Sequence, residues 1–151
     1  MAEFAEAGRF VGQVVRFGAL AVCIHDYFYQ TNITSGPSMY PTLDEEGYAV
    51  LVNVWKLRER RVRRHEVVVF ESPRPRHGKH TMCKRVLGVE GDVVLVGGGT
   101  RKMVVPKGHV WVEGDNPFNS GDSRAFGPIP EALVVGIATW RIFPPTKIAP
   151  L

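Results

Sequence analysis

The feature that most constrains the fold of this chain is a series of seven short, valine-rich segments between residues 48 and 143. The segments are YAVLVNVW (48–55), EVVVF (66–70), TMCKRVLGV (81–89), DVVLV (92–96), KMVVP (102–106), HVWVEGD (109–115) and ALVVGIATWRIF (132–143). β-branched and aromatic residues favour strands, and the glycine, proline and polar residues between them favour turns. The GGG at 97–99 predicts a hairpin turn between two of the strands. The sequence therefore predicts a mainly β domain, an antiparallel sheet or small barrel with few helices.

The first thirty residues differ from the rest of the chain. Few polar residues interrupt the apolar run from Phe10 to Tyr29, which is typical of a helix. Its uninterrupted apolar part, Phe17–Ile24, is shorter than the ~20 residues of a clean membrane span. We expect residues 1–30 to form a single membrane-anchor helix and residues 31–151 to form the β domain. A soluble amphipathic helix docked on the domain is the alternative.

The residues that flank this apolar run predict an orientation in the membrane. Tyr27, Phe28 and Tyr29 end the run, where aromatic side chains can anchor a helix at the membrane interface. Arg9 and Arg16 precede the uninterrupted stretch Phe17–Ile24, and no lysine or arginine occurs from Phe17 to Trp55. Because positive charge favours the side from which a segment is inserted, the β domain is expected on the opposite side of the membrane.

The net charge of +4 is concentrated in one run of the sequence. KLRERRVRR (56–64) carries six basic residues and one acid, a sum of +5, so the rest of the chain sums to 4 − 5 = −1. Such a run can bind phosphates or an anionic membrane surface, although a solvated loop or strand end is the simpler interpretation. No motif of a nucleic-acid-binding fold accompanies it, so no nucleic-acid partner is predicted.

A candidate nucleophile lies in the segment SGPSMYPTL (35–43). Ser38 stands among Gly36, Pro37 and Pro41, which predict an irregular, constrained turn. A serine on such a turn can present its hydroxyl outward and its own N–H toward a developing oxyanion, as acyl transfer requires. Serine, glycine and proline are also ordinary loop residues, so the motif acquires catalytic meaning only together with a base.

The best candidate base is Lys84 in the predicted strand TMCKRVLGV. None of the five histidines lies in a recognisable catalytic-triad context. Strand alternation places Met82, Lys84 and Val86 on one face and Cys83, Arg85 and Leu87 on the other. Lys84 would then have apolar neighbours, and desolvation lowers the pKa of a lysine so that its neutral amine can accept the Ser38 proton. An exposed lysine on a sheet is the alternative.

The two cysteines, Cys23 and Cys83, are too few for a disulfide scaffold. No Cys/His spacing predicts a zinc site. Cys83 is expected to be a small packed residue that faces away from Lys84, rather than a catalytic thiol. The sequence thus indicates neither a metal nor an organic cofactor.

A third polar cluster is EGDNPFNSGDSRAFGPIP (113–130), which is dense in residues that cap and cross-link loops. Asp122 and Arg124 are spaced for a local ion pair, and Ser120 could exchange a hydrogen bond with a buried amine. A purely structural turn would also account for this composition.

Together the three segments resemble the type I signal peptidases, serine endopeptidases that use a Ser/Lys dyad. The residues that carry the resemblance are Ser38, Met39, Pro41 and Thr42; Lys84, Arg85, Val86, Gly88, Gly91 and Asp92; and Gly114, Asp115, Asn116, Asn119, Ser120, Asp122, Ser123, Arg124, Gly127 and Pro128. It extends over residues 35–137 and implies a signal-peptidase-like β fold without a cofactor.

The resemblance implies a role for each matching residue. Ser38 is the expected nucleophile, Lys84 the general base and Ser120 the hydroxyl that positions the lysine amine. Asp122 and Arg124 are expected to form a supporting ion pair. The oxyanion would be bound by the Ser38 N–H.

One position departs from the bacterial pattern and indicates which branch of the family the chain resembles. Gly36 occupies the place where bacterial members carry a serine that helps to form the oxyanion hole, and this GPSM form is similar to the mitochondrial branch. That resemblance implies a location in the mitochondrial inner membrane with the catalytic domain facing the intermembrane space. It also implies removal of sorting peptides from precursor proteins and assembly with a second, related protease subunit. The CKRV and NSGDSR segments favour the first of the two subunits, with the second as an alternative.

Two other hypotheses about the same residues predict different activities. A self-cleaving protease with the same dyad would cut its own chain, but the DNA-binding domain expected of such repressor-type proteins is missing from the sequence. A non-catalytic, membrane-anchored β module would bind anionic lipid or nucleic acid through the basic run, and its binding would depend on salt.

Overall fold

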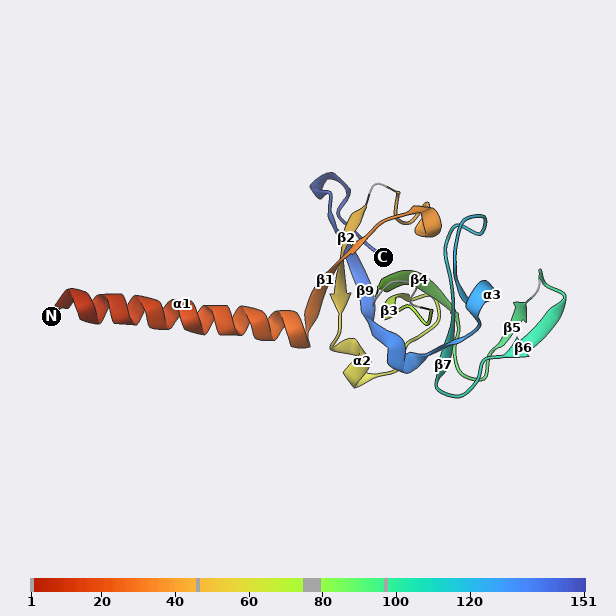
Figure 1. Ribbon diagram of the computed structural model, residues 1–151, viewed down its shortest axis with the longest axis horizontal. Coiled ribbons are helices and arrows are strands. Elements are labelled where there is room, and N and C mark those ends of the chain that lie inside the picture. Colours follow the sequence, from red (N-terminus) through yellow and green to blue (C-terminus); the bar gives the residue numbers. More distant parts are fainter. Residues whose placement is uncertain (1, 46, 75–79, 97) are drawn as a thin grey trace.

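A long amino-terminal helix projects from a β domain in the computed structural model, which describes residues 2–45, 47–74, 80–96 and 98–151 (Figure 1). The helix, α1, extends from Ala2 to Tyr27. Its segment Ala7–Tyr27 is long and apolar enough to cross a membrane, with a mean hydropathy of 1.4, and none of it is buried against the domain. A helix that packs on its own domain would bury an apolar face. The exposed helix is therefore a candidate membrane anchor, and the alternative of a docked amphipathic helix is wrong.

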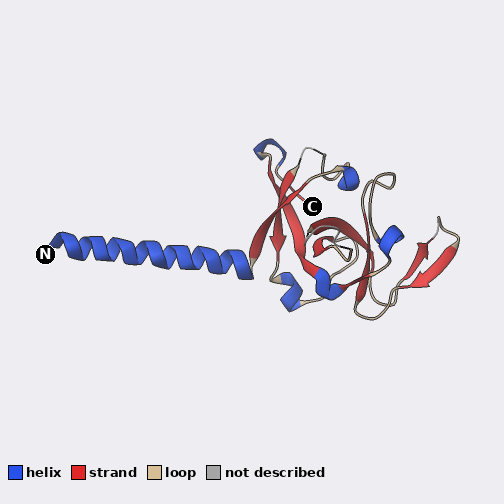
Figure 2. Ribbon diagram, in the orientation of Figure 1, coloured by secondary structure: helices blue, strands red, loops and turns tan. Residues whose placement is uncertain are grey.

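The described residues of the β domain form ten strands. They are β1 (Tyr29–Thr34), β2 (Tyr48–Asn53), β3 (Val67–Glu71), β4 (Thr81–Gly88), β5 (Val93–Val96), β6 (Arg101–Val104), β7 (His109–Glu113), β8 (Ile129–Pro130), β9 (Val134–Phe143) and β10 (Ala149–Pro150). The other helical elements are short: α2 (Lys56–Glu59), α3 (Ser123–Phe126) and the 3-10 turns η1 (Pro37–Met39), η2 (Glu131–Leu133) and η3 (Pro145–Lys147). Figure 2 shows that, apart from α1, strands dominate the molecule.

Eight of the strands form one curled antiparallel sheet in the order β1-β2-β9-β3-β4-β7-β8, and β10 pairs with β9 (Figure 1). Strands β5 and β6 form a separate hairpin. All seven valine-rich segments contain a strand, so the predicted mainly β fold is confirmed. The hairpin expected around GGG is also present, although Gly97 itself lies outside the described residues.

The curvature of the sheet buries both faces of its central strands. On β3, Val67 and Val69 join one apolar cluster, and Val68 and Phe70 join a second cluster on the opposite face. A strand buried on both faces reads as a continuous apolar run rather than an alternating one, which explains the VVVF at 67–70. The sheet thus encloses a core that can hold a polar side chain away from water.

The end of α1 is fixed to the domain by aromatic contacts. Phe28 stacks on Trp55 with ring centroids 5.0 Å apart, and the guanidinium of Arg58 lies 4.9 Å from the ring centroid of Tyr27. The chain then enters β1 at Tyr29, so the expectation that the helix continues to Tyr29 is wrong by two residues. Tyr29 is the first residue of β1 to pair with β2, and this long-range pairing ends the helix.

Three of the six basic residues in the run at 56–64 pair with acids that lie outside the run. Arg60 pairs with Glu66, and Arg64 pairs with Asp92. Arg61 pairs with Glu90 at 2.6 Å. The run comprises α2 and the first part of the loop that leads to β3, and these contacts favour its interpretation as a solvated segment, because paired guanidinium groups are less available to lipid or nucleic-acid phosphates.

Candidate active site

Ser38 lies on the tight turn η1, which the preceding residues shape. Gly36 has φ +101°, a left-handed conformation that strongly favours glycine, so the serine of the bacterial pattern would be strained at this position. Asn116 holds the turn from the loop after β7, because its side-chain amide donates to the Pro37 carbonyl and its N–H donates to the Ser38 carbonyl, both at 3.1 Å. Asn116 therefore holds the backbone of Ser38 and of the residue before it.

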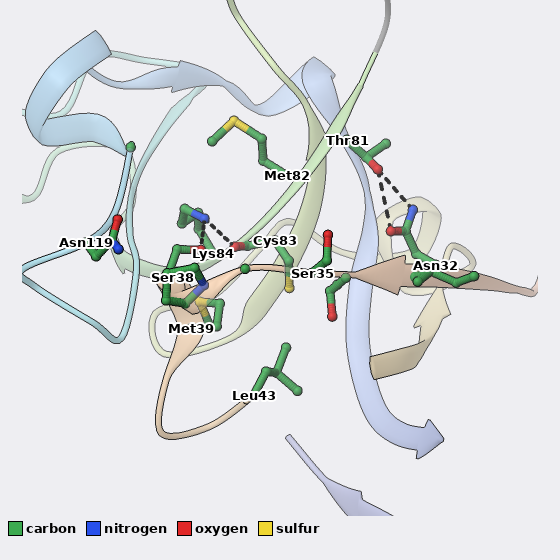
Figure 3. Close-up of a pocket in the computed structure, with 15 residues that line it drawn as sticks. Asn32, Ser35, Ser38, Met39, Leu43, Thr81, Met82, Cys83, Lys84 and Asn119 are labelled. Carbon is green, nitrogen blue, oxygen red and sulfur yellow. Dashed lines mark hydrogen bonds between the residues drawn. The ribbon is translucent and has the colours of Figure 1, made fainter. Parts of the chain in front are cut away.

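Lys84 points from β4 toward this turn. Its Nζ lies 2.6 Å from Ser38 Oγ and donates to the Cys83 carbonyl at 2.9 Å (Figure 3). Pairing of Lys84 with Val68 places it in the central part of the sheet, and the residue is only 4% exposed. The alternative of an exposed lysine is thus wrong, and the structure brings together the predicted nucleophile and base from positions 46 residues apart.

The surroundings of Lys84 favour its neutral form. Burial is the main cause that lowers its pKa below the ordinary lysine value, and this outweighs the opposing attraction of nearby acidic groups. Asp115 and Asp122, the carboxylates among those groups, are each bound by an arginine: Arg85 at 2.7 Å and Arg124 at 2.7 Å. With these carboxylates already paired, the amine is kept in its neutral form, which is the form that can take the Ser38 proton.

Ser120 is close to the dyad but is not hydrogen-bonded to it. Its Oγ is buried and has no hydrogen-bond partner among the described residues. The hydroxyl still lies near enough to Asp122 to help lower the pKa of that carboxyl. The hydroxyl packs against Gly114: a Cβ on Gly114 would lie 2.3 Å from Ser120 Oγ and 2.3 Å from the Ser38 carbonyl oxygen. Gly114 therefore lets Ser120 and the Ser38 backbone approach each other.

Asp122 organises the loop that carries Ser120. Its carboxylate accepts hydrogen bonds from the Arg124 side chain at 2.7 and 2.9 Å and from the Gly114 N–H at 3.0 Å. It also caps α3 by accepting from the Arg124 N–H at 3.1 Å. Burial alone would raise the pKa of Asp122, but these hydrogen bonds lower it to about 2. The local ion pair expected from the spacing of Asp122 and Arg124 is present.

A second ion pair, which the sequence did not indicate, links the three motifs. Arg85 binds Asp115 with two hydrogen bonds, of 2.8 Å from Nε and 2.7 Å from Nη2. Thr42 donates to the same carboxylate at 2.5 Å. All three residues were among those that carry the family resemblance, but Thr42 and Asp115 are 73 residues apart, so no local pattern could reveal the contact. A bidentate Arg–carboxylate pair fixes geometry well, and here it joins the serine loop to β4 and to the loop after β7.

The side chain of Cys83 is not placed to act in catalysis. It packs in the apolar cluster with Met39 and Leu43, on the face opposite Met82 and Val86, as strand alternation predicted. Burial raises the pKa of its thiol to about 12, so the nucleophilic thiolate is not formed at neutral pH. In the portion of the chain that the structure describes, no group of three or more potential metal ligands is assembled.

A cavity of about 340 Å³ opens beside the dyad. Its walls are β1, the turn at Ser38 and the first half of β4, with Asn119 at one side (Figure 3). Gly121 also lines the cavity. The dyad thus borders a space large enough for part of a peptide. A buried amine, a hydroxyl within hydrogen-bonding distance of it and an adjacent groove can together support acyl transfer by a serine nucleophile.

Comparisons with known proteins agree with this chemistry. The family described as "Signal peptidase, peptidase S26" matches residues 7–103 and 96–143. Mitochondrial inner membrane protease subunit 1 of Schizosaccharomyces pombe is 40% identical over 134 residues, which cover 87% of this chain and 84% of that protein. The human subunit 1 is 37% identical over 140 residues, 90% of this chain and 82% of that protein. Subunit 2 of the Danio rerio protease is 41% identical over 117 residues, 74% of this chain and 63% of that protein.

Proposed function

The chain belongs to the signal peptidase family, peptidase S26, and from this premise we propose which of its residues perform the reaction. It is a serine endopeptidase that removes signal peptides, of the mitochondrial inner membrane protease kind. The single observation that carries the assignment of residues is the 2.6 Å separation of Lys84 Nζ and Ser38 Oγ in a buried site.

The proposed reaction begins with proton transfer from Ser38 to Lys84. The neutral amine of Lys84 accepts the Ser38 proton while Oγ attacks the scissile carbonyl, and the Ser38 N–H donates to the oxyanion. The Lys84 ammonium then returns the proton to the leaving amine, which leaves an acyl-enzyme on Ser38. In the second half of the reaction Lys84 activates a water molecule, and hydrolysis of the ester regenerates the enzyme.

Ser120, Asp122 and Arg124 act as positioning residues in this proposal. The unpartnered, buried hydroxyl of Ser120 supplies an acceptor for the Lys84 ammonium when the side chains close around substrate. Asp122 and Arg124 hold the Ser120 loop through their ion pair and the Gly114 N–H. The Ser38 N–H lies in the first turn of η1, where N–H groups lack an intrahelical acceptor, which supports its use as the oxyanion donor.

The proposed setting is the mitochondrial inner membrane. Residues 1–30 would form the anchor and residues 31–151 the protease domain, with the exposed helix α1 supporting the division. Arg9 and Arg16 precede the uninterrupted apolar stretch Phe17–Ile24, which supports a domain in the intermembrane space. The similarity to proteins named subunit 1 and subunit 2 supports assembly with a second, related subunit, and the higher coverage of subunit 1 proteins supports that assignment. The substrates would be precursor proteins with amino-terminal sorting peptides.

Cleavage by the purified, detergent-solubilised full chain tests this proposal. An inner-membrane precursor is incubated with the unmodified chain, with Ser38→Ala and with Lys84→Ala, in the presence and absence of a second subunit. Ser72→Ala and Lys102→Ala are the matched controls, because both lie outside the site. We expect the first two variants to remain folded and to lose cleavage, and the controls to retain it.

The same assay separates the alternatives. Cleavage that survives Lys84→Ala would show that another group is the base. Cleavage of the enzyme's own chain instead of the separate precursor would indicate a self-processing protease. A folded chain that cuts nothing, even with the second subunit, would contradict the proteolytic assignment of these residues.

A further inference from the structure

The β5–β6 hairpin is held on the domain by only one of its two faces. Val94 from β5 is buried in an apolar cluster with Val105 and Trp111, and Met103 from β6 packs against this cluster. Val94 and Met103 are cross-strand partners, so they lie on the same face of the hairpin. The hairpin therefore has a fixed position on the domain, and its second face is turned away from the cluster.

The second face, which we call the outer hairpin face, consists of Val93, Leu95, Lys102 and Val104. Val93 pairs with Val104 and Leu95 pairs with Lys102, so the four side chains lie together. The three apolar residues are 58–60% exposed. Adjacent apolar side chains that stay in contact with water are typical of an interaction site.

The position of the hairpin argues against a membrane as the partner of this face. Figure 1 shows the hairpin and α1 at opposite ends of the molecule. The candidate membrane span, Ala7–Tyr27, is the part of α1 that would lie in the bilayer. A membrane that this helix crosses is therefore remote from β5 and β6, and the outer hairpin face fits another protein instead.

Positive charge at the outer hairpin face indicates the chemistry of that protein. Lys102 belongs to the face and Arg101 precedes it, and both residues are exposed. Neither pairs with an acid in the described ranges of the chain. A second copy of this chain that docked through the same face would bring these cations together, and like charges oppose association. The face therefore fits a different chain, with an apolar patch and acidic side chains beside it.

The comparisons with known proteins connect the hairpin to one branch of the family. The family model matches in two pieces, 7–103 and 96–143, whose overlap covers the turn of the hairpin and most of β6. The matches to subunit 1 of Schizosaccharomyces pombe and subunit 2 of Danio rerio cover 87% and 74% of this chain. A continuous stretch of either length includes the whole hairpin wherever it begins. The general family match is thus interrupted at the hairpin, whereas relatives named as subunits 1 and 2 of the mitochondrial inner membrane protease align through it.

We propose that the outer hairpin face is the docking surface for the second, related protease subunit, which presents an apolar patch with acidic side chains beside it. The inference rests on the assembly with a second subunit that is part of the proposed function. A complete interface contains about 20–30 residues on each side, so the hairpin supplies its apolar centre, where a few side chains carry most of the binding energy.

The test measures binding of the fluorescently labelled second subunit, from the same organism, to the full chain in detergent. Leu95→Glu places a charge in the apolar part of the face, and Lys102→Glu reverses the charge beside it. Ile148→Glu is the matched control for the first variant, because Ile148 is 55% exposed and lies between η3 and β10. Arg63→Glu is the control for the second, because Arg63 is exposed and makes no ion pair with the residues that the structure places. Thermal melting verifies that all variants are folded.

We expect Leu95→Glu and Lys102→Glu each to raise the dissociation constant about tenfold or more, and both controls to leave it within about threefold. Higher salt should weaken the binding of the unmodified chain, because charge attraction contributes to it. Binding that is unchanged in both hairpin variants overturns the inference and leaves the proposed function intact.

Two further outcomes would also overturn the inference. Light scattering that shows the unmodified chain to self-associate, and Leu95→Glu to be monomeric, would make a second copy the occupant of the face. If the unmodified chain does not bind the second subunit, the assembly part of the proposed function is wrong and the inference falls with it. Precursor cleavage measured on the same preparation tests the Ser38 and Lys84 dyad separately from this result.

Discussion

Replacement of Gly114 by alanine is expected to displace the nucleophile without altering any side chain of the dyad. The added Cβ would lie 2.3 Å from the Ser38 carbonyl oxygen and 2.3 Å from Ser120 Oγ. Carbon–oxygen contacts normally measure about 3.3 Å or more, so each neighbour has to move by about 1 Å. The Ser120 hydroxyl can rotate away, but the Ser38 carbonyl is backbone and is bound by the Asn116 N–H at 3.1 Å. The turn that carries Ser38 therefore has to shift.

The size of that shift sets the expected loss of activity. A misplacement of about 1 Å in a catalytic group costs on the order of 10²-fold in rate. We expect kcat/KM of Gly114→Ala to fall by about that factor, which corresponds to about 2.7 kcal/mol of transition-state stabilisation. Strain from the extra methyl group should also lower the free energy of unfolding by about 1–3 kcal/mol.

Gly12→Ala is the matched control, because a Cβ at Gly12 in α1 meets nothing within 4 Å and Gly12 is not among the residues that line the cavity. The assay measures precursor cleavage and thermal melting of both variants, at a temperature well below their melting points. The control should match the unmodified chain in both measurements. If Gly114→Ala kept kcat/KM within about threefold of the unmodified value, the tight approach of Ser38 and Ser120 would not be a requirement for catalysis.

Three further predictions follow from the ionisable groups of the site. Because burial lowers the pKa of Lys84, the cleavage rate should rise with pH through a value below the ordinary lysine pKa of 10.5. Lys84→Arg should be inactive, since a guanidinium stays protonated. A cleavage rate that falls over this pH range would contradict the assignment of Lys84 as the base. The pKa of Asp122 is about 2 in the fold, whereas its ordinary value is 3.8. The ionised carboxylate therefore stabilises the fold above about pH 4 by about 2 kcal/mol, and this stabilisation is lost as the pH falls toward 2. Urea unfolding should therefore find Asp122→Asn less stable at pH 7, with a smaller difference at pH 3; an equal difference at both pH values would refute this. Cys83 should resist iodoacetamide in the folded enzyme and react after unfolding, as read by mass spectrometry, and labelling of Cys83 in active enzyme would contradict its burial.

Local sequence pattern was sufficient to predict the strands and the face to which Lys84 belongs. Valine-rich runs separated by turn residues specify strands through short-range preferences, and alternation along β4 separates Cys83 from Met82 and Val86 whatever lies around the strand. The turn at Ser38 was likewise evident from Gly36 and Pro37, because their backbone preferences are intrinsic.

Structural features that depend on partners distant in the sequence were predicted poorly. The aromatic residues after the apolar run suit a helix as well as a strand, and the pairing of β1 with β2 decided that the helix ends at Tyr27. The Arg85–Asp115 pair was missed for the same reason, since the two residues are 30 positions apart. Short β strands such as β8 and β10 gave no sequence signal of their own, because each consists of two residues held by a neighbour.

The sequence by itself determined a β domain with an amino-terminal apolar helix, and it supplied a serine on a constrained turn, a lysine on an apolar strand and a polar loop in the order of the S26 family. Only the tertiary structure decided that Lys84 is buried, that its Nζ lies 2.6 Å from Ser38 Oγ, and that one face of the β5–β6 hairpin stays exposed. The physical reason is that composition and periodicity act through neighbours along the chain. Desolvation and hydrogen-bond geometry at the site arise instead from segments that the curled sheet brings together from distant positions.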